Sequence, residues 1–183
     1  GVTLLSGECM AWNKQPALLN TLTALMQAGE ERVVLQTPYI ICNGAMYDAL
    51  AQVAGGTAQV QIITNAPQSG ANPWGCTDYL NHQSDILATG VSVCEWSGND
   101  SMHTKTVLID DTVSIIGSFN WDMRSAYLDT EMMLLVDCPA MNAALRGEAD
   151  EMVRQSRTVL PDGSTVDGSE YIEPTLPLTK KMV

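Results

Sequence analysis

The stretch HTKTVLIDDTVSIIGSFN, residues 103–120, indicates how the second half of the chain folds. Two apolar, β-branched runs, residues 105–109 and 112–117, flank the dipeptide Asp110-Asp111. Two such runs that are joined by a pair of turn-forming residues predict an antiparallel hairpin, although this pair lacks the glycine that is usual in tight turns. We therefore expect two adjacent strands with their turn at Asp110-Asp111.

Four polar side chains flank this hairpin at its open end. His103 and Lys105 are two residues apart, so on a strand their side chains emerge on the same face. The hairpin returns the chain, and Ser118 and Asn120, which follow Gly117, can then lie beside that face. An imidazole, an ammonium, a hydroxyl and a carboxamide thus converge. Such a set predicts an anion-binding pocket that contains a nucleophile.

Helix-like and strand-like segments alternate around the hairpin. Strand, helix and hairpin in this order favour an α/β fold, a mixed β-sheet with helices on both faces. We expect this domain to span residues 1–157, followed by an extended tail, residues 158–183, in which prolines and glycines recur. The other predicted strands are 32–36, 59–64, 91–95 and 131–136, and the predicted helices are 16–28, 43–53, 77–88 and 140–157.

Composition excludes several classes of function. Hydrophobic residues make up 45% of the 183-residue chain and charged residues 16%, which is typical of a folded globular domain. The net charge is −12 and the basic residues are scattered, so we do not expect a nucleic-acid partner. None of the five cysteines belongs to a CxxC pair or to a zinc-binding spacing, and we expect free thiols, no metal and no cofactor. No apolar run reaches the ~18 residues of a membrane-spanning helix, so we expect a soluble chain.

The order His-x-Lys-x4-Asp, followed by Gly-Ser-x-Asn, resembles the signature of the phospholipase D superfamily. The segment GSFNWDMRSAYLDTEMMLLV, residues 117–136, resembles the second motif region of bacterial cardiolipin synthases. The resemblance to the second half of these enzymes covers about residues 4–157. It also includes TPYIICNGAM (37–46), QIITNAP (61–67) and ILATGVSVCEW (86–96).

The resemblance implies cleavage of a phosphodiester through a phosphohistidine intermediate. The neutral imidazole of His103 would attack phosphorus, which splits one displacement into two. Lys105, Asn120 and Ser118 would offset charge on the non-bridging oxygens. Glu131 would accept the proton of the other ring nitrogen and so fix the tautomer.

Other motif residues are expected to be structural. Asp110 lies at the hairpin tip, where an Asp side chain bonds backbone amides, and Gly117 belongs to the turn that follows the strand. Arg124 and Ser125 match the family and are expected to brace the loop after the motif, although Arg124 could equally form a buried ion pair without substrate contact. The family sequence Asn-Thr-Glu is here Asp129-Thr130-Glu131, a departure that keeps the Glu.

Structural explanations compete with each of these assignments. A single His, Lys or Gly-Ser on a strand is more often structural than catalytic, and only their joint spacing favours a site. We expect His82 to be a surface residue on its predicted helix. We expect residues 37–39 and the loop 74–79 to line the cleft.

One histidine cannot hold the phosphoryl group and protonate the leaving alkoxide at once. The superfamily supplies a second motif, either in the same chain or through a homodimer. We therefore expect the partner to be the first-motif half of a longer protein or a second copy, and this half alone to be nearly inactive. The full-length protein is expected at a membrane surface, on the cytoplasmic side, acting on a phospholipid as a phosphatidyltransferase.

Two alternatives stay open. A single-motif homodimeric phosphodiesterase or nuclease would share the motif residues, but the acidic balance and the cardiolipin synthase-like flanks argue against it. A non-catalytic scaffold module would not need the intact set of His, Lys, Ser, Asn and Glu.

Overall fold

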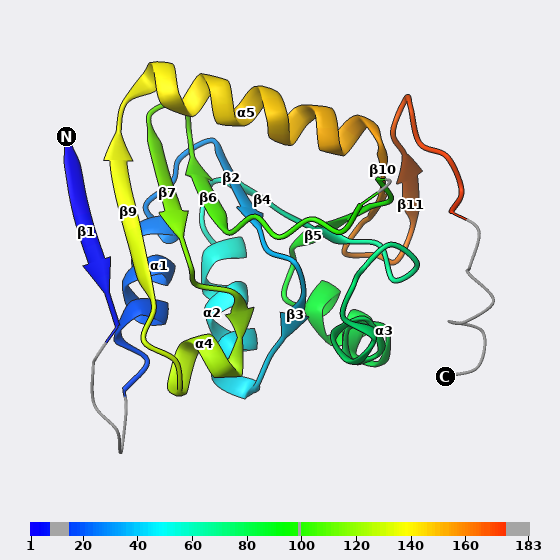
Figure 1. The fold of residues 1–183 in the computed structure, drawn as a ribbon, viewed down its shortest axis with the longest axis horizontal. Helices are drawn as coiled ribbons and strands as arrows, with labels where there is room; N and C mark the ends of the chain where they lie inside the picture. Colours follow the sequence, from blue (N-terminus) through cyan, green and yellow to red (C-terminus); the bar gives the residue numbers. More distant parts are fainter. Residues whose placement is uncertain (8–14, 99, 175–183) are drawn as a thin grey trace.

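A nine-stranded mixed β-sheet forms the centre of the protein in a computed structural model that describes residues 1–7, 15–98 and 100–174 (Figure 1). The strands β2, β4 and β5 are parallel to one another, and the strands on either side of them pair antiparallel. Across the sheet the order is β1 (Val2–Ser6), β9 (Met132–Asp137), β7 (Val113–Gly117), β6 (Thr106–Ile109), β2 (Arg32–Gln36), β4 (Gln59–Asn65), β5 (Ser92–Trp96), β10 (Ser156–Val159) and β11 (Thr165–Asp167).

Helices cover both faces of this sheet, as the sequence predicted. One face packs against α1 (Ala17–Gln27), α2 (Gly44–Ala54), α3 (Pro73–Ala88) and the short α4 (Met123–Tyr127), and α5 (Pro139–Arg154) crosses the other (Figure 1). Alternate residues of β2 face opposite sides: Val33 and Leu35 join the large core, whereas Val34 joins the smaller core under α5. The α/β fold class with helices on both faces is confirmed.

Local sequence signals explain where helices begin. Asn43 caps α2, since its side chain accepts a hydrogen bond from the amide of Met46 at 3.0 Å. Asn72 caps α3 in the same way through Gly75, at 3.2 Å, and Pro73 occupies the first turn. The helix therefore starts four residues before the predicted residue 77.

The segment after α5 differs from the expected extended tail. The helix ends at Arg154, and β10 then pairs antiparallel with β5 and β11 with β10. Asp162-Gly163 makes the turn of this hairpin, with Gly163 at φ 80°. The sheet thus continues beyond residue 157, because β5 offers an unpaired edge that β10 completes. Residues 175–183 of the expected tail lie outside the described residues.

Small additions complete the architecture. β3 (Ile40–Ile41) pairs in parallel with β8 (Trp121–Asp122), which links the segment after β2 to the segment after β7. Cys42, Cys94 and Cys138 are free thiols, and Cys9 lies outside the described residues. Among the described helices, none has both the length and the apolar composition that crossing a bilayer requires.

Candidate active site

The hairpin β6–β7 lies inside the sheet, between β2 and β9, and its register runs from Thr106 opposite Ile116 to Ile109 opposite Val113. Its open end reaches the edge of the sheet at which the parallel strands β2 and β4 also end. Ligands of open α/β sheets commonly bind at the carboxyl ends of parallel strands. The predicted site residues at the open end therefore lie where ligands of such sheets commonly bind.

Asp110 fixes the closed end of the hairpin. Its backbone has φ 45°, a left-handed conformation that Asp tolerates better than most residues. Its Oδ1 accepts hydrogen bonds from the amides of Glu31 (2.8 Å) and Arg32 (3.0 Å), and Oδ2 accepts one from Glu30 (3.0 Å). Burial raises the pKa of Asp110, but these amides outweigh it and hold the pKa below its ordinary value. The contacts support a structural role for Asp110.

Arg146 of α5 reinforces this turn from the other side. Its Nε donates to the carbonyl oxygen of Asp110 at 2.8 Å and to Oδ1 of Asn142 at 3.0 Å. The side chain is 8% exposed, and burial together with the nearby charge of Arg32 lowers its pKa. The helix α5 and the hairpin tip are thus one connected unit.

His103 and Lys105 meet at the open end. His103 is exposed and precedes β6, and the Lys105 ammonium lies 3.0 Å from its Nδ1 and donates to its carbonyl oxygen at 2.7 Å. A protonated ammonium can only donate, so Nδ1 is the acceptor in this contact. Burial lowers the pKa of Lys105, and the charges of Glu131 and Asp122 oppose that effect. The sequence predicted that the two side chains share one face of a strand, whereas both residues precede β6 and meet outside it.

Asn120, Ser125 and Glu131 form a second connected group. The Ser125 hydroxyl donates to Glu131 Oε1 at 2.7 Å and accepts from the Asn120 amide at 3.1 Å and from Asn120 Nδ2 at 3.3 Å. Glu131 is 6% exposed. Ser125 is held in turn by Asp122, which caps α4 through the Ser125 amide at 2.7 Å. Ser125 braces the loop after the motif, as expected.

The expected contact between Glu131 and His103 is not formed. Among the described residues, no hydrogen bond joins the two, because the carboxylate is turned to Ser125 and the imidazole Nδ1 to Lys105. Glu131 is nonetheless close enough to Lys105 for its charge to act on that ammonium. The buried Oδ1 of Asn120 has no hydrogen-bond partner within the part of the chain that the structure describes. One acceptor of the group is therefore unsatisfied.

Ser118, another predicted site residue, bonds the backbone of β9 and not the other predicted site residues. Its hydroxyl accepts from the Met132 amide at 3.0 Å and donates to the Met132 carbonyl oxygen at 3.3 Å, so it extends the β7–β9 pairing. A Cβ at Gly117 would clash with the Met132 backbone, which explains the glycine there. The strand end requires these two residues independently of any ligand.

Arg124 forms an ion pair, but on the surface rather than in the interior. Its Nε lies 3.0 Å from Oδ2 of Asp129, and its side chain is 73% exposed. Asp129 is the residue that departs from the family's Asn-Thr-Glu sequence. The departure thus supplies the partner of a neighbouring arginine.

A cavity of about 240 Å³ lies beside His103. Pro38 and Tyr39 line it. Residues 74–79, expected as a loop, belong to α3; of these, Cys76 lines the cavity, whereas Trp74 is 81% exposed. Asn65, which was not among the predicted site residues, lines the cavity from the end of β4. Its position directly after a buried strand was the signal that could have found it. The remaining lining residues are Gly70, Ala71, Asn72 and Ser101.

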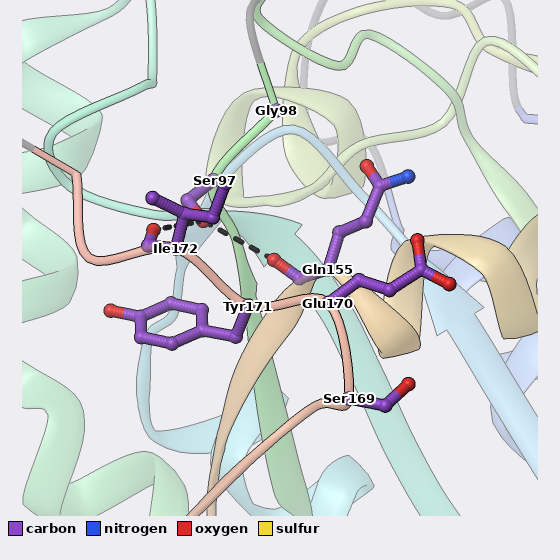
Figure 2. A pocket seen from close by; sticks show the side chains of 7 residues that line it. All are labelled: Ser97, Gly98, Gln155, Ser169, Glu170, Tyr171 and Ile172. Carbon is purple, nitrogen blue, oxygen red and sulfur yellow. Dashed lines mark hydrogen bonds between the residues drawn. The ribbon is translucent and has the colours of Figure 1, made fainter.

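A larger cavity, of about 600 Å³, lies at the C-terminal hairpin and contains none of the predicted site residues (Figure 2). Backbone and side chains of residues 169–172 form one wall, and Ser97 Oγ donates to carbonyl oxygens of Gln155 (3.2 Å) and Ile172 (3.4 Å). Its one carboxylate, Glu170, lies 3.5 Å from Arg154. No His–Lys pair stands among the described residues that line it, so we place the candidate site at His103.

The nine-stranded mixed sheet with helices on both faces defines the fold of the protein, and several solved structures share it. The phospholipase D family member Nuc from Salmonella typhimurium matches with a TM-score of 0.68 and 14% identity, over 87% of this chain and 99% of its own. NucT from Helicobacter pylori matches with 0.61 and 21%, over 85% and 97%. Phosphatidylserine synthase from Haemophilus influenzae Rd KW20 matches with 0.61 and 20%, over 99% and 44%.

Sequence comparison gives the family. Residues 22–153 match the family described as "Cardiolipin synthase, PLD-like domain", and the chain belongs to that family. Cardiolipin synthase A of Salmonella arizonae and that of Salmonella paratyphi B are each 30% identical over 131 residues, 71% of this chain. The chain spans about a quarter of these relatives, 26% of their length. Membership of the phospholipase D superfamily, expected from the motif, is confirmed.

Proposed function

We propose that this chain supplies one half of a phosphodiester-cleaving active site, with His103 as the nucleophile. The observation that carries the proposal is the 3.0 Å contact between His103 and Lys105, exposed at the open end of a hairpin whose other end is firmly bonded. At this exposed place the nucleophile can attack phosphorus, and the cation beside it can offset the negative charge of the phosphodiester.

The chemistry takes two displacements. An imidazole lone pair attacks phosphorus, the phosphorus–oxygen bond to the leaving alcohol breaks, and the alkoxide takes a proton from a general acid. In the second step, water or a second alcohol attacks the phosphohistidine, releases the imidazole and transfers its proton to a base. A phosphate oxygen that draws Lys105 away would free Nδ1, so the substrate itself would prepare the imidazole.

The general acid is proposed to come from outside this chain. The chain has two histidines, and His82 lies on α3, where its Nδ1 is 3.2 Å from Asp85. The proposed partner is the first-motif half of a longer protein or a second copy of this chain. The solved structures include chains of about the matched length and a chain about twice as long, because the match covers 97–99% of Nuc and NucT but 44% of phosphatidylserine synthase.

The proposed substrate is a phospholipid, and the proposed reaction is phosphatidyl transfer of the cardiolipin synthase type. The family match and the 30% identity to cardiolipin synthase A support it, as does the net charge of −12, which disfavours binding along a nucleic-acid backbone. On this proposal the full-length protein works at a membrane surface, on the cytoplasmic side. A homodimeric phosphodiesterase is the second candidate, favoured by the fold match to Nuc and NucT.

The deciding experiment measures turnover of bis(p-nitrophenyl) phosphate in chelator over a wide range of protein concentration. His103→Ala is the test variant, and His82→Ala is the matched control, since it removes the other histidine. We expect little or no turnover by the isolated chain and a rise on addition of the preceding half of the parent protein, abolished by His103→Ala. Turnover that rises steeply with concentration favours the homodimer instead. Inactivity of the folded chain under both conditions overturns the enzymatic proposal and leaves the scaffold module.

A further inference from the structure

Asn65 is a buried polar residue whose side-chain hydrogen bonds all go to the backbone of the two segments that flank the cavity. It ends β4 and is 5% exposed. Its Nδ2 donates to the carbonyl oxygens of Pro38 at 2.8 Å and of Met102 at 2.9 Å, and its Oδ1 accepts from the Met102 amide at 2.7 Å. Three short bonds in a buried place make this contact energetically important.

The Met102 contact acts on the residue next to His103. Residues 101–105 form no strand or helix, and the sheet bonds this segment at Lys105, whose carbonyl oxygen accepts from the Gly117 amide at 3.2 Å, two residues after His103. The Asn65 carboxamide bonds both the amide and the carbonyl of Met102, as a neighbouring strand would. The Cα of His103 is thereby attached to a fixed point.

The Pro38 contact acts on a second segment that lines the cavity. Pro38 precedes Tyr39, and both line the 240 Å³ cavity together with His103. One carboxamide thus holds two segments that line the same cavity. Both protons of Nδ2 are used in these bonds, so Asn65 has none left to donate to a ligand.

We propose that Asn65 is a positioning residue, which fixes His103 against the Pro38–Tyr39 wall so that the imidazole faces the cavity. The proposal rests on the proposed function of His103. An aspartate at this place would keep the acceptor for the Met102 amide but would turn a carboxylate toward two carbonyl oxygens. An alanine would remove all three bonds without adding charge.

The experiment uses ¹⁵N-edited NMR of the imidazole rings in the full chain, titrated with inorganic phosphate. The chain has two histidines, so His82 is an internal reference in each spectrum. Asn65→Asp and Asn65→Ala are the test variants. Asn43→Asp is the matched control, because Asp caps a helix as well as Asn does and the charge change is the same.

We expect both Asn65 variants to shift the His103 ring signals before phosphate is added and to weaken phosphate binding at His103 by about tenfold or more, with His82 and the control unchanged. If both variants fold and their His103 signals and phosphate affinity equal those of Asn43→Asp, the role of Asn65 is overturned. If both lose the native spectrum as a whole, Asn65 is a general stability element and the proposal is also overturned. If phosphate leaves His103 unmoved even in the wild type, the proposed function is what fails.

Discussion

The two ends of the β6–β7 hairpin carry residues of one motif and differ in how completely they are bonded. At the closed end, three backbone amides and Arg146 bind Asp110. At the open end, the side chain of Lys105 bonds only His103 among the described residues. A well-bonded turn holds the hairpin in place, and the few contacts at the other end leave polar groups available for a ligand. Within one motif, Asp110 thus holds the hairpin in place, and His103 and Lys105 are left available for a ligand.

The largest effect is expected from changing the open end. Lys105→Met keeps the apolar stem but removes the cation that would offset phosphate charge, so turnover by the assembled site should fall by about 10²–10³-fold. The free energy of unfolding should change little, which urea denaturation checks. A loss of stability comparable to that of a core mutation would show that Lys105 has a structural role.

The closed end should give the opposite result. Asp110→Ala removes the acceptor of three amides and places a side chain without local hydrogen bonds at positive φ. The free energy of unfolding should therefore fall by about 2 kcal/mol. Turnover per folded molecule should be nearly unchanged. A fall in that turnover, measured under conditions in which the variant is fully folded, would mean that Asp110 also serves the chemistry.

The stability that Asp110 contributes at the closed end should depend on pH. The folded-state pKa of Asp110 lies below its ordinary value of 3.8, so its carboxylate stabilises the fold above that value and the contribution is lost as the pH falls through the lower folded-state pKa. Relative to Asp110→Asn, the wild type should be more stable at pH 6, and the difference should shrink below about pH 4. Denaturation curves for both proteins from pH 7 to 3 test this, and a difference that grows in acid would contradict it.

The smallest effect is expected at the surface pair beside the site. Arg124 and Asp129 are exposed, and ion pairs in water contribute little to stability. Arg124→Ala should leave the thermal midpoint essentially unchanged, at low salt and at high salt. A clear drop in turnover of the assembled site without a change in midpoint would instead make Arg124 a substrate contact.

Much of this arrangement could be predicted from local sequence. The β-branched runs around Asp110-Asp111 predicted the hairpin. The i, i+2 argument for His103 and Lys105 assumed a strand, whereas both residues precede β6 and meet through the Lys105 ammonium. The partner of Glu131 was not predictable, because Ser125 and His103 both offer a donor and the choice depends on how α4 packs. The prolines and glycines of residues 158–183 predicted an extended tail, yet Asp162-Gly163 turns a hairpin there, because the edge of β5 that β10 completes lies far away in the sequence.

The edge strand β1 has a consequence for the order in which the chain folds. Val2 pairs with Val136, whereas the pairs of β6 and β7 are separated by ten residues or fewer. Closing a long loop costs more entropy than closing a short one, and β1 has no place to dock until β9 lies on β7. The hairpin with the motif should therefore form early and β1 last. In native-state hydrogen exchange, the amides of β1 should open well before those of β6.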